Sequence, residues 1–368
     1  MHSDFHYYGT YALARMAGLR RDVCQTIATA AQFVDDNDTT SDIDLLDGGR
    51  LYALATAHPM VNIQNSALFD KDQRRVWLPF HFLPGNEGKT ISERLICRKD
   101  SAIAQQMVKH CFSMVKKSYG LHLVGISSHV YADTFSHYGF MGVSSRWNKV
   151  DSRSIKLLND IRDKDAEGRF QTKYGETMSG LRNWRQSLWD KVKSDVAESG
   201  TGALGHGAVL KYPDFPYLEW EFSYEHPEGS QRVSHRKNAT TFLEACEKIY
   251  GLFCSLDPNL HDLEIIQDKG FDRIRDKVKE ILKFQETNRE KRSAKWRSAA
   301  EEGILFHRPE EILPYQGDAW KQSLDELSDH AESSEVHKMP AFQFYQAAAT
   351  YRTYVLRELL PAHGLLVG

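Results

Sequence analysis

The sequence predicts an all-α protein, because most of its apolar residues recur at the spacing of amphipathic helices. Residues 101–138 predict one long helix or two stacked helices broken near Tyr119 and Gly120, and residues 340–360 predict another with aromatic side chains at helical intervals. Thr241 and Glu244 form a capping box, which marks the start of a further helix. We therefore expect a multi-helix bundle core with additional helices around it.

The remaining helices follow in chain order. Residues 4–17 predict a first helix that ends at Gly18, and a second begins near Asp22 and ends in an acidic run at residues 35–38. From residue 41 to residue 88 the pattern loosens into loops or short alternating segments broken by prolines. The helical pattern is therefore expected to be interrupted in this region. The aromatic residues Tyr217, Trp220, Phe222 and Tyr224 form either a substrate wall or a core strand or extended segment.

The chain divides into a core and a charged C-terminal region. Residues 1–260 form the expected core, and residues 145–200 within them read as a helical insertion rich in alternating charge. Residues 261–368 predict amphipathic helices that pack on the core. Four basic residues there are expected to lie on a solvated helix face, although Trp296 among them would also suit a single-stranded nucleic-acid site. They are Lys291, Arg292, Lys295 and Arg297.

Charge and cysteine content narrow the functional classes. A net charge of −3 gives no general attraction to nucleic acids or anionic membranes. Five scattered cysteines without a CxxC pair indicate neither a disulfide framework nor a cysteine zinc site. Because we find neither a signal peptide nor a transmembrane stretch, we expect a cytoplasmic protein, with export by a signal-independent route left open.

The residues with the strongest chemical signal lie on one face of the helix predicted over residues 101–138. His129, Asp133 and His137 follow one another at intervals of four, which places two imidazoles and a carboxylate within an arc of about 80°. Taken alone, either histidine would be interpreted more simply as a hydrogen-bonded residue of a polar core. The three together predict a metal-ligand face.

Further ligand candidates precede this face. His6 lies in the first turn of the first helix. Asp35 or Asp36 ends the second helix, where acidic residues oppose the helix dipole and would otherwise form a solvated turn. His81 lies in a loop between prolines and aromatic residues, and it is either a ligand or a structural histidine.

Two candidates follow the face, and two histidines are expected to support it. His206 is flanked by glycines, which allow close backbone approach to a ligand, and Asp214 lies between two prolines in a rigid turn. His122 precedes His129 by seven residues on nearly the same helix face. We expect His122 and His58 to be hydrogen-bonding partners of ligands rather than ligands themselves.

This donor set indicates two or three divalent ions. Nitrogen and oxygen donors without sulfur favour zinc, and manganese or iron would also fit. A cluster of such ions lowers the pKa of a water molecule and neutralises a phosphoryl group, so phosphoester hydrolysis is the expected reaction. Asp36 and Asp133 are the expected catalytic carboxylates. The substrate would be a lipid, a nucleotide or a single-stranded nucleic acid.

The ligand order resembles that of the zinc-dependent phospholipase C and P1 nuclease group. His129-xxx-Asp133 and a further histidine resemble its signature, and His6, Asp35 or Asp36 and His81 precede it in the group's order. The resemblance implies an all-α phosphodiesterase fold with a trinuclear zinc site. This chain lacks the group's N-terminal Trp ligand, and His206 and Asp214 are further apart than its closing pair. The segments at residues 5–10 and 31–36 are also similar to an uncharacterised bacterial family.

Two alternatives remain open at the level of the sequence. An HD-type phosphohydrolase acting on nucleotides is also all-α, and the adjacent His-Asp pair that it needs occurs at His261 and Asp262. A helical regulatory or interaction protein with a structural metal is the other alternative. A structural site usually closes with four ligands, which is fewer than the candidates offered here.

Overall fold

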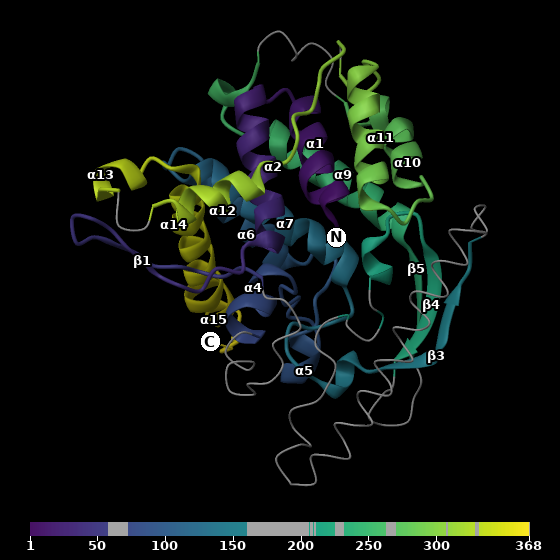
Figure 1. Ribbon diagram of the computed structural model, residues 1–368. Coiled ribbons are helices and arrows are strands. Elements are labelled where there is room, and N and C mark those ends of the chain that lie inside the picture. Colours follow the sequence, from purple (N-terminus) through teal and green to yellow (C-terminus); the bar gives the residue numbers. More distant parts are fainter. Residues whose placement is uncertain are drawn as a thin grey trace.

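The central element of the structure is α7 (Gly120–His137), a helix whose side chains are almost all buried. The computed structural model describes residues 1–57, 73–159, 206, 209, 211–224, 232–262, 270–306, 308–327 and 331–367. Helices α2 (Arg21–Asp36), α6 (Ala102–Ser113) and α9 (Asn238–Cys254) pack around α7 (Figure 1). The bundle core predicted from the sequence is therefore present.

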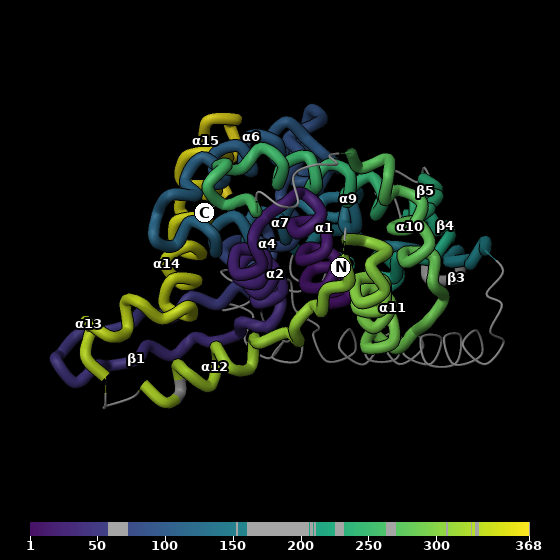
Figure 2. The backbone as a smooth tube through the Cα atoms, turned by 90° about the horizontal axis from the view of Figure 1, so that it is seen from above, coloured from purple at the N-terminus to yellow at the C-terminus, as the bar shows by residue number. Residues whose placement is uncertain are grey.

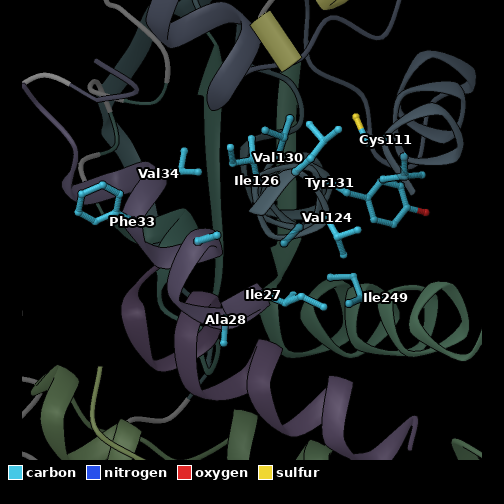
Figure 3. Close-up of a cluster of buried hydrophobic side chains, with 14 of the residues drawn as sticks. Ile27, Ala28, Phe33, Val34, Cys111, Val124, Ile126, Val130, Tyr131 and Ile249 are labelled. Atoms are coloured by element: carbon cyan, nitrogen blue, oxygen red, sulfur yellow. The ribbon is translucent and has the colours of Figure 1, made fainter. Parts of the chain in front are cut away.

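Close packing between α2 and α7 depends on a glycine. A Cβ atom on Gly125 would lie 2.4 Å from the carbonyl oxygen of Ile27 and 2.7 Å from the Cβ of Ala30. Figure 3 shows the apolar layer around this contact, in which Ile27 and Val34 of α2 lie near Val124, Ile126 and Val130 of α7. Because α2 and α7 both carry candidate ligands, their close approach sets the width of the site.

Short helical segments connect these elements. Near the N-terminus, η1 leads directly into α1, and later turns carry the chain past α7. Their bounds are η1 (Asp4–Gly9), α1 (Thr10–Met16), η2 (Gln73–Trp77), α4 (Leu78–Phe80), α5 (Ile91–Arg94), η3 (Arg146–Asn148), η5 (Tyr212–Asp214) and η6 (Pro258–Leu260).

Two small sheets accompany the helices, so the all-α expectation holds for most of the described structure and not for these strands. Strands β1 (Ile43–Asp44) and β2 (Arg50–Leu51) form a hairpin. Strands β3 (Val150–Leu157), β4 (Glu219–Tyr224) and β5 (Arg232–Lys237) form an antiparallel sheet in the order β3-β4-β5. Residues 150–157 of the expected helical insertion therefore form a strand, and residues 160–200 lie outside the described residues.

Packing explains why this sheet forms. Trp220 and Phe222 alternate along β4 and are buried, together with Phe140, Val150 and Phe82, in a small apolar cluster separate from the main core. An alternating apolar pattern buries one face of a strand, whereas a helix would scatter the same residues around its axis. The aromatic residues of β4 thus form part of a buried core strand.

The described C-terminal helices pack on the same body. Helix α11 lies against η1, and α14 lies against α7. The segment around α12 and α13 extends beside the β1–β2 hairpin (Figure 2), where Ser333 donates its hydroxyl hydrogen bond to Asp47 over 2.9 Å. The bounds are α10 (Asp272–Leu282), α11 (Arg289–Glu301), α12 (Gly317–Asp325), α13 (Ser333–Val336), α14 (Pro340–Thr353), η7 (Tyr354–Leu359) and α15 (Leu360–Ala362).

A buried ion pair ties the C-terminal region to the first helix. The Arg15 guanidinium of α1 donates to both carboxylate oxygens of Glu310 at 2.8–3.0 Å, and its Nη1 also reaches Asp262 at 3.2 Å.

No helix among the described residues combines the length and the apolar character that a membrane span requires.

Candidate metal centre

Asp133 of α7 lies at the centre of a cluster of imidazoles. Its Oδ1 atom is 3.1 Å from Nε2 of His6 on η1. Its Oδ2 atom is 3.2 Å from Nε2 of His129 and 3.5 Å from Nδ1 of His137, the residues one turn before and one turn after it. All four side chains are buried. The helical spacing thus places one carboxylate between three imidazoles.

A second group joins the end of α2 to α7. Asp35 Oδ1 lies 3.8 Å from both His129 Nε2 and His81 Nδ1, and these two nitrogens are 3.4 Å apart. The other ring nitrogen of His81, Nε2, lies 2.8 Å from the carbonyl oxygen of Thr56. Since a carbonyl only accepts, Nε2 carries the hydrogen and donates, and this fixes Nδ1 toward Asp35 and Asp133.

A third group is formed where η5 meets the end of α7. His137 Nε2 lies 3.2 Å from Asp214 Oδ1, and His206 Nε2 lies 3.9 Å from Asp214 Oδ2. His137 Nδ1 lies 2.9 Å from the carbonyl oxygen of His81, so it donates there and directs Nε2 toward Asp214. A ring nitrogen held by a carbonyl is the usual support of a histidine ligand.

The amino group of Met1 connects two of these groups. Its nitrogen lies 2.8 Å from Asp133 Oδ1 and 3.3 Å from Asp214 Oδ1. Burial by itself lowers the pKa of this amino group, but the two carboxylates outweigh burial and raise it to about 11. The protonated amino group therefore neutralises part of the buried negative charge.

The electrostatics of the cluster suit a cation. Burial by itself raises the pKa of Asp133, yet His137, the Met1 amino group and His129 together hold it well below its usual value. Burial and the neighbouring His129 hold the pKa of His6 well below its usual value, so that ring is neutral. For His81, Asp133 and Asp35 outweigh burial and raise the pKa. The nearby carboxylates that favour a proton on His81 Nδ1 would equally favour a metal ion at that nitrogen.

Unpaired atoms provide a direct test of whether the residues fit a metal. Asp133 Oδ2, His6 Nδ1 and His129 Nδ1 are buried and have no hydrogen-bond partner. Buried polar atoms are rarely left unpaired, so Asp133 Oδ2, which lies near His129, His81 and His137, indicates an unfilled ligand shell. The two Nδ1 atoms do not add to this evidence, because His6 and His129 direct Nε2 toward Asp133. Ligand atoms in each of three groups lie within 4.8 Å of one another. The groups are His6-His129-Asp133, Asp35-His81-His129 and His137-His206-Asp214.

The structure brings together most of the residues that the sequence singles out. Eight of them form the three groups, and they come from six separate parts of the chain. Asp36 is not a member of any group, since its carboxylate accepts a hydrogen bond from Gln32 at 3.2 Å and lines the adjoining pocket. His58 lies outside the described residues.

His122 does not support a ligand as predicted. Both of its ring nitrogens lack a hydrogen-bond partner, and its ring packs 5.3 Å from that of Trp320 on α12. Seven residues correspond to a rise of about 10 Å along a helix, which separates His122 from His129 although they share a face. Burial lowers the pKa of His122 to about 4.

Two of the groups, Asp35-His81-His129 and His137-His206-Asp214, border a pocket of about 740 Å³, whereas His6, His129 and Asp133 are buried behind its lining. Its lining includes ligand candidates such as Asp35, His81 and Asp214, and it also includes aromatic and charged side chains. The latter include Tyr8, Trp77, Tyr315, Arg289 and Lys321. Tyr315 and Lys321 come from the C-terminal region, where the sequence shows no motif that would connect them to the histidines. The Met1 amino group was also missed, because backbone groups leave no pattern in a sequence.

Comparison with known proteins gives a family without an assigned activity. No curated protein and no solved structure matches the chain. Residues 1–359 match DUF6765, which is described as a family of unknown function. The match covers almost the whole chain, including η1, α7 and the C-terminal helices that surround the pocket. The protein belongs to the DUF6765 family.

Proposed function

We propose that this protein is a metal-dependent phosphoester hydrolase with a core of the phospholipase C and P1 nuclease type. The observation that carries the proposal is the position of Asp133, a buried carboxylate whose two oxygens face imidazoles from three ligand groups. A carboxylate that faces several metal-binding groups suits a centre of two or three ions. Nitrogen and oxygen donors without sulfur favour zinc, with manganese or iron as the other candidates.

An open ligand shell favours catalysis over a structural metal. Structural zinc sites are closed by four protein ligands, whereas catalytic sites keep a position for water or substrate. The Asp35-His81-His129 and His137-His206-Asp214 groups each offer three residues and border a pocket of about 740 Å³. This arrangement supports an enzyme over a regulatory protein with a structural ion.

The chain's own residues have separable roles in the proposed reaction. Ions held by the three groups would lower the pKa of a water molecule and offset the negative charge of a phosphoryl group. Asp133 sets the spacing between the groups. Asp36, held by Gln32 on the pocket wall, is placed to accept a proton or orient a water molecule. Arg289 and Lys321 also line the pocket and supply positive charge there.

The alternative of an HD-type phosphohydrolase receives less support. His261 Nε2 lies 3.3 Å from the carbonyl oxygen of Leu256, and Asp262 is paired with Arg15. His261 also forms a backbone bridge with Leu19. Neither residue belongs to the three ligand groups. The adjacent His-Asp pair thus has a structural explanation.

The proposal is tested with protein that is purified without any chelator. Elemental analysis should find at least one transition metal per chain, and the holoprotein should hydrolyse bis-p-nitrophenyl phosphate, a phospholipid or single-stranded DNA. Bound metal without turnover of any of the three would favour a structural metal. Absence of bound metal would refute the metal centre itself.

A further inference from the structure

Arg292 of α11 is buried, although the sequence predicts it on a solvated basic face. Only 3% of its surface is exposed, whereas Lys291 and Lys295 beside it on the helix are exposed. Its guanidinium forms a two-point ion pair with Asp4, with Nε 2.9 Å from Oδ2 and Nη2 3.0 Å from Oδ1. A buried arginine with this geometry has a specific partner and is no part of a diffuse basic surface.

The rest of the guanidinium is also engaged. Nη1 donates to the carbonyl oxygens of Glu286 at 2.8 Å and Thr287 at 3.1 Å. Nη2 lies 3.3 Å from His2 Nδ1, and the guanidinium carbon lies 5.1 Å from the centre of the Phe215 ring. Arg292 therefore joins the loop before α11, the N-terminal segment and the loop after η5.

Two of these segments form the edges of the candidate metal centre. The N-terminal segment that carries His2 and Asp4 also carries the Met1 amino group and His6. Phe215 directly follows Asp214, and His2 Nδ1 lies 3.2 Å from the Asp214 carbonyl oxygen. In Figure 1 the N-terminus lies between α11 and α7. One side chain thus holds both edges against the body of the protein.

We propose that Arg292 is a positioning residue that fixes His6 and Asp214 at the spacing required for metal binding. This inference rests on the proposed function in assuming that the three groups hold metal. It makes α11, a helix without ligands of its own, part of the site. It also predicts that the His6-His129-Asp133 and His137-His206-Asp214 groups depend on Arg292 more than the Asp35-His81-His129 group does.

Lysine cannot replace arginine in this position. An ammonium group reaches one carboxylate oxygen at a time and lacks the planar fork that contacts Asp4, the two carbonyl groups and the Phe215 ring together. An Arg292→Lys variant therefore keeps the charge and loses the multipoint contact. Supporting contacts of this kind usually change metal affinity by 10- to 100-fold, and we expect at least about tenfold weaker zinc binding.

The experiment compares Arg292→Lys with Arg15→Lys. Arg15 forms the same kind of buried two-point pair, with Glu310, but its other partners, the Leu19 carbonyl oxygen and Asp262, do not belong to the segments that carry His6 and Asp214. Both variants should lower the thermal midpoint, which measures the structural effect alone. Zinc affinity, measured by competition with a chelator well below the midpoint, should fall in Arg292→Lys and remain unchanged in Arg15→Lys.

Two outcomes would overturn the inference. One is zinc affinity in folded Arg292→Lys within twofold of the wild type, and the other is an equal loss in both variants. If Arg292→Lys does not fold, Asp4→Asn replaces it, because this isosteric change weakens the same ion pair from the other side. Zinc affinity is measured without substrate. If the protein hydrolyses no phosphoester, the proposed function is refuted, but the comparison of zinc affinities still tests the role of Arg292.

Discussion

Asp133 Oδ2 and His129 Nε2 lie 3.2 Å apart on successive turns of α7, yet the oxygen accepts no hydrogen bond. Atoms this close would normally form a charge-assisted hydrogen bond if the geometry allowed it. Instead both face the same region beside the helix, together with Asp35 and His81. This relationship is the geometric basis of the proposed metal centre, and the following predictions depend on it.

Gly125 should be essential for the contact between α2 and α7. In Gly125→Ala the added methyl group would lie 2.4 Å from the Ile27 carbonyl oxygen, so the helices must separate. We expect a loss of about 1–3 kcal/mol in the free energy of unfolding, measured by denaturant titration. Zinc affinity should also fall, since Asp35 moves with α2.

A second helical glycine provides the control. A Cβ atom on Gly251 of α9 would meet nothing within 4 Å. Gly251→Ala should therefore keep zinc affinity and keep or raise stability by up to about 1 kcal/mol, because alanine favours the helix. Equal stability of the two variants would show that the α2–α7 contact is looser than described.

His206 should contribute to one ligand group only. Its ring faces Asp214 from a separate segment, and 18% of its side chain is exposed. His206→Ala should weaken zinc binding at the His137-His206-Asp214 group and leave the other two groups intact. Zinc titration of stripped protein should show one weakened equivalent with a nearly unchanged thermal midpoint.

The matched variant is His235→Ala, which removes an exposed histidine from β5. Its titration should superimpose on that of the wild type. Loss of all bound zinc in His206→Ala would contradict the division into separate groups.

His122 should make the protein sensitive to mild acid. Burial lowers its pKa from 6.5 to about 4, so the unfolded chain binds a proton at a higher pH than the folded protein does. Stability should therefore fall as the pH drops from about 6.5 to about 4, by up to about 3 kcal/mol from this residue. Neither ring nitrogen has a partner to lose on substitution.

The measurement is the difference between the wild type and His122→Leu, both stripped of metal, in thermal midpoint across this pH range. Near neutral pH the thermal midpoint of the variant should equal or exceed that of the wild type. Toward pH 4 the midpoint of the wild type should fall further below that of the variant. Parallel curves would show that His122 is already protonated in the folded protein or reaches solvent.

The sequence predicts the centre of this site better than its surroundings. His129, Asp133 and His137 could be placed together because the helical period fixes their directions within one continuous element. Asp35 and Asp36 could not be separated, since their roles depend on how the last turn of α2 meets α7. Arg292 was misplaced because a run of basic residues does not reveal that one of them finds a buried carboxylate 288 positions away.

The fold shows the same limit. Helices with strong periodicity, such as α7 and α14, could be predicted from the sequence, whereas β3 could not, since its pairing with β4 is a tertiary contact. The prediction of helix over residues 150–157 was wrong because charged side chains, which suit a solvated helix, also occur on strands at the edge of a sheet, where β3 lies.

The zinc dependence of bis-p-nitrophenyl phosphate hydrolysis tests the central claim most directly, in chelator-stripped wild type and Asp133→Asn. Asparagine keeps the size of Asp133 and removes the charge between the ligand groups, while Asp22→Asn on the exposed start of α2 serves as the control. We predict that hydrolysis by the wild type and the control rises with bound zinc and that Asp133→Asn neither binds zinc tightly nor turns over. Full restoration of hydrolysis in Asp133→Asn, or zinc-loaded wild type without hydrolysis, would contradict the proposed mechanism.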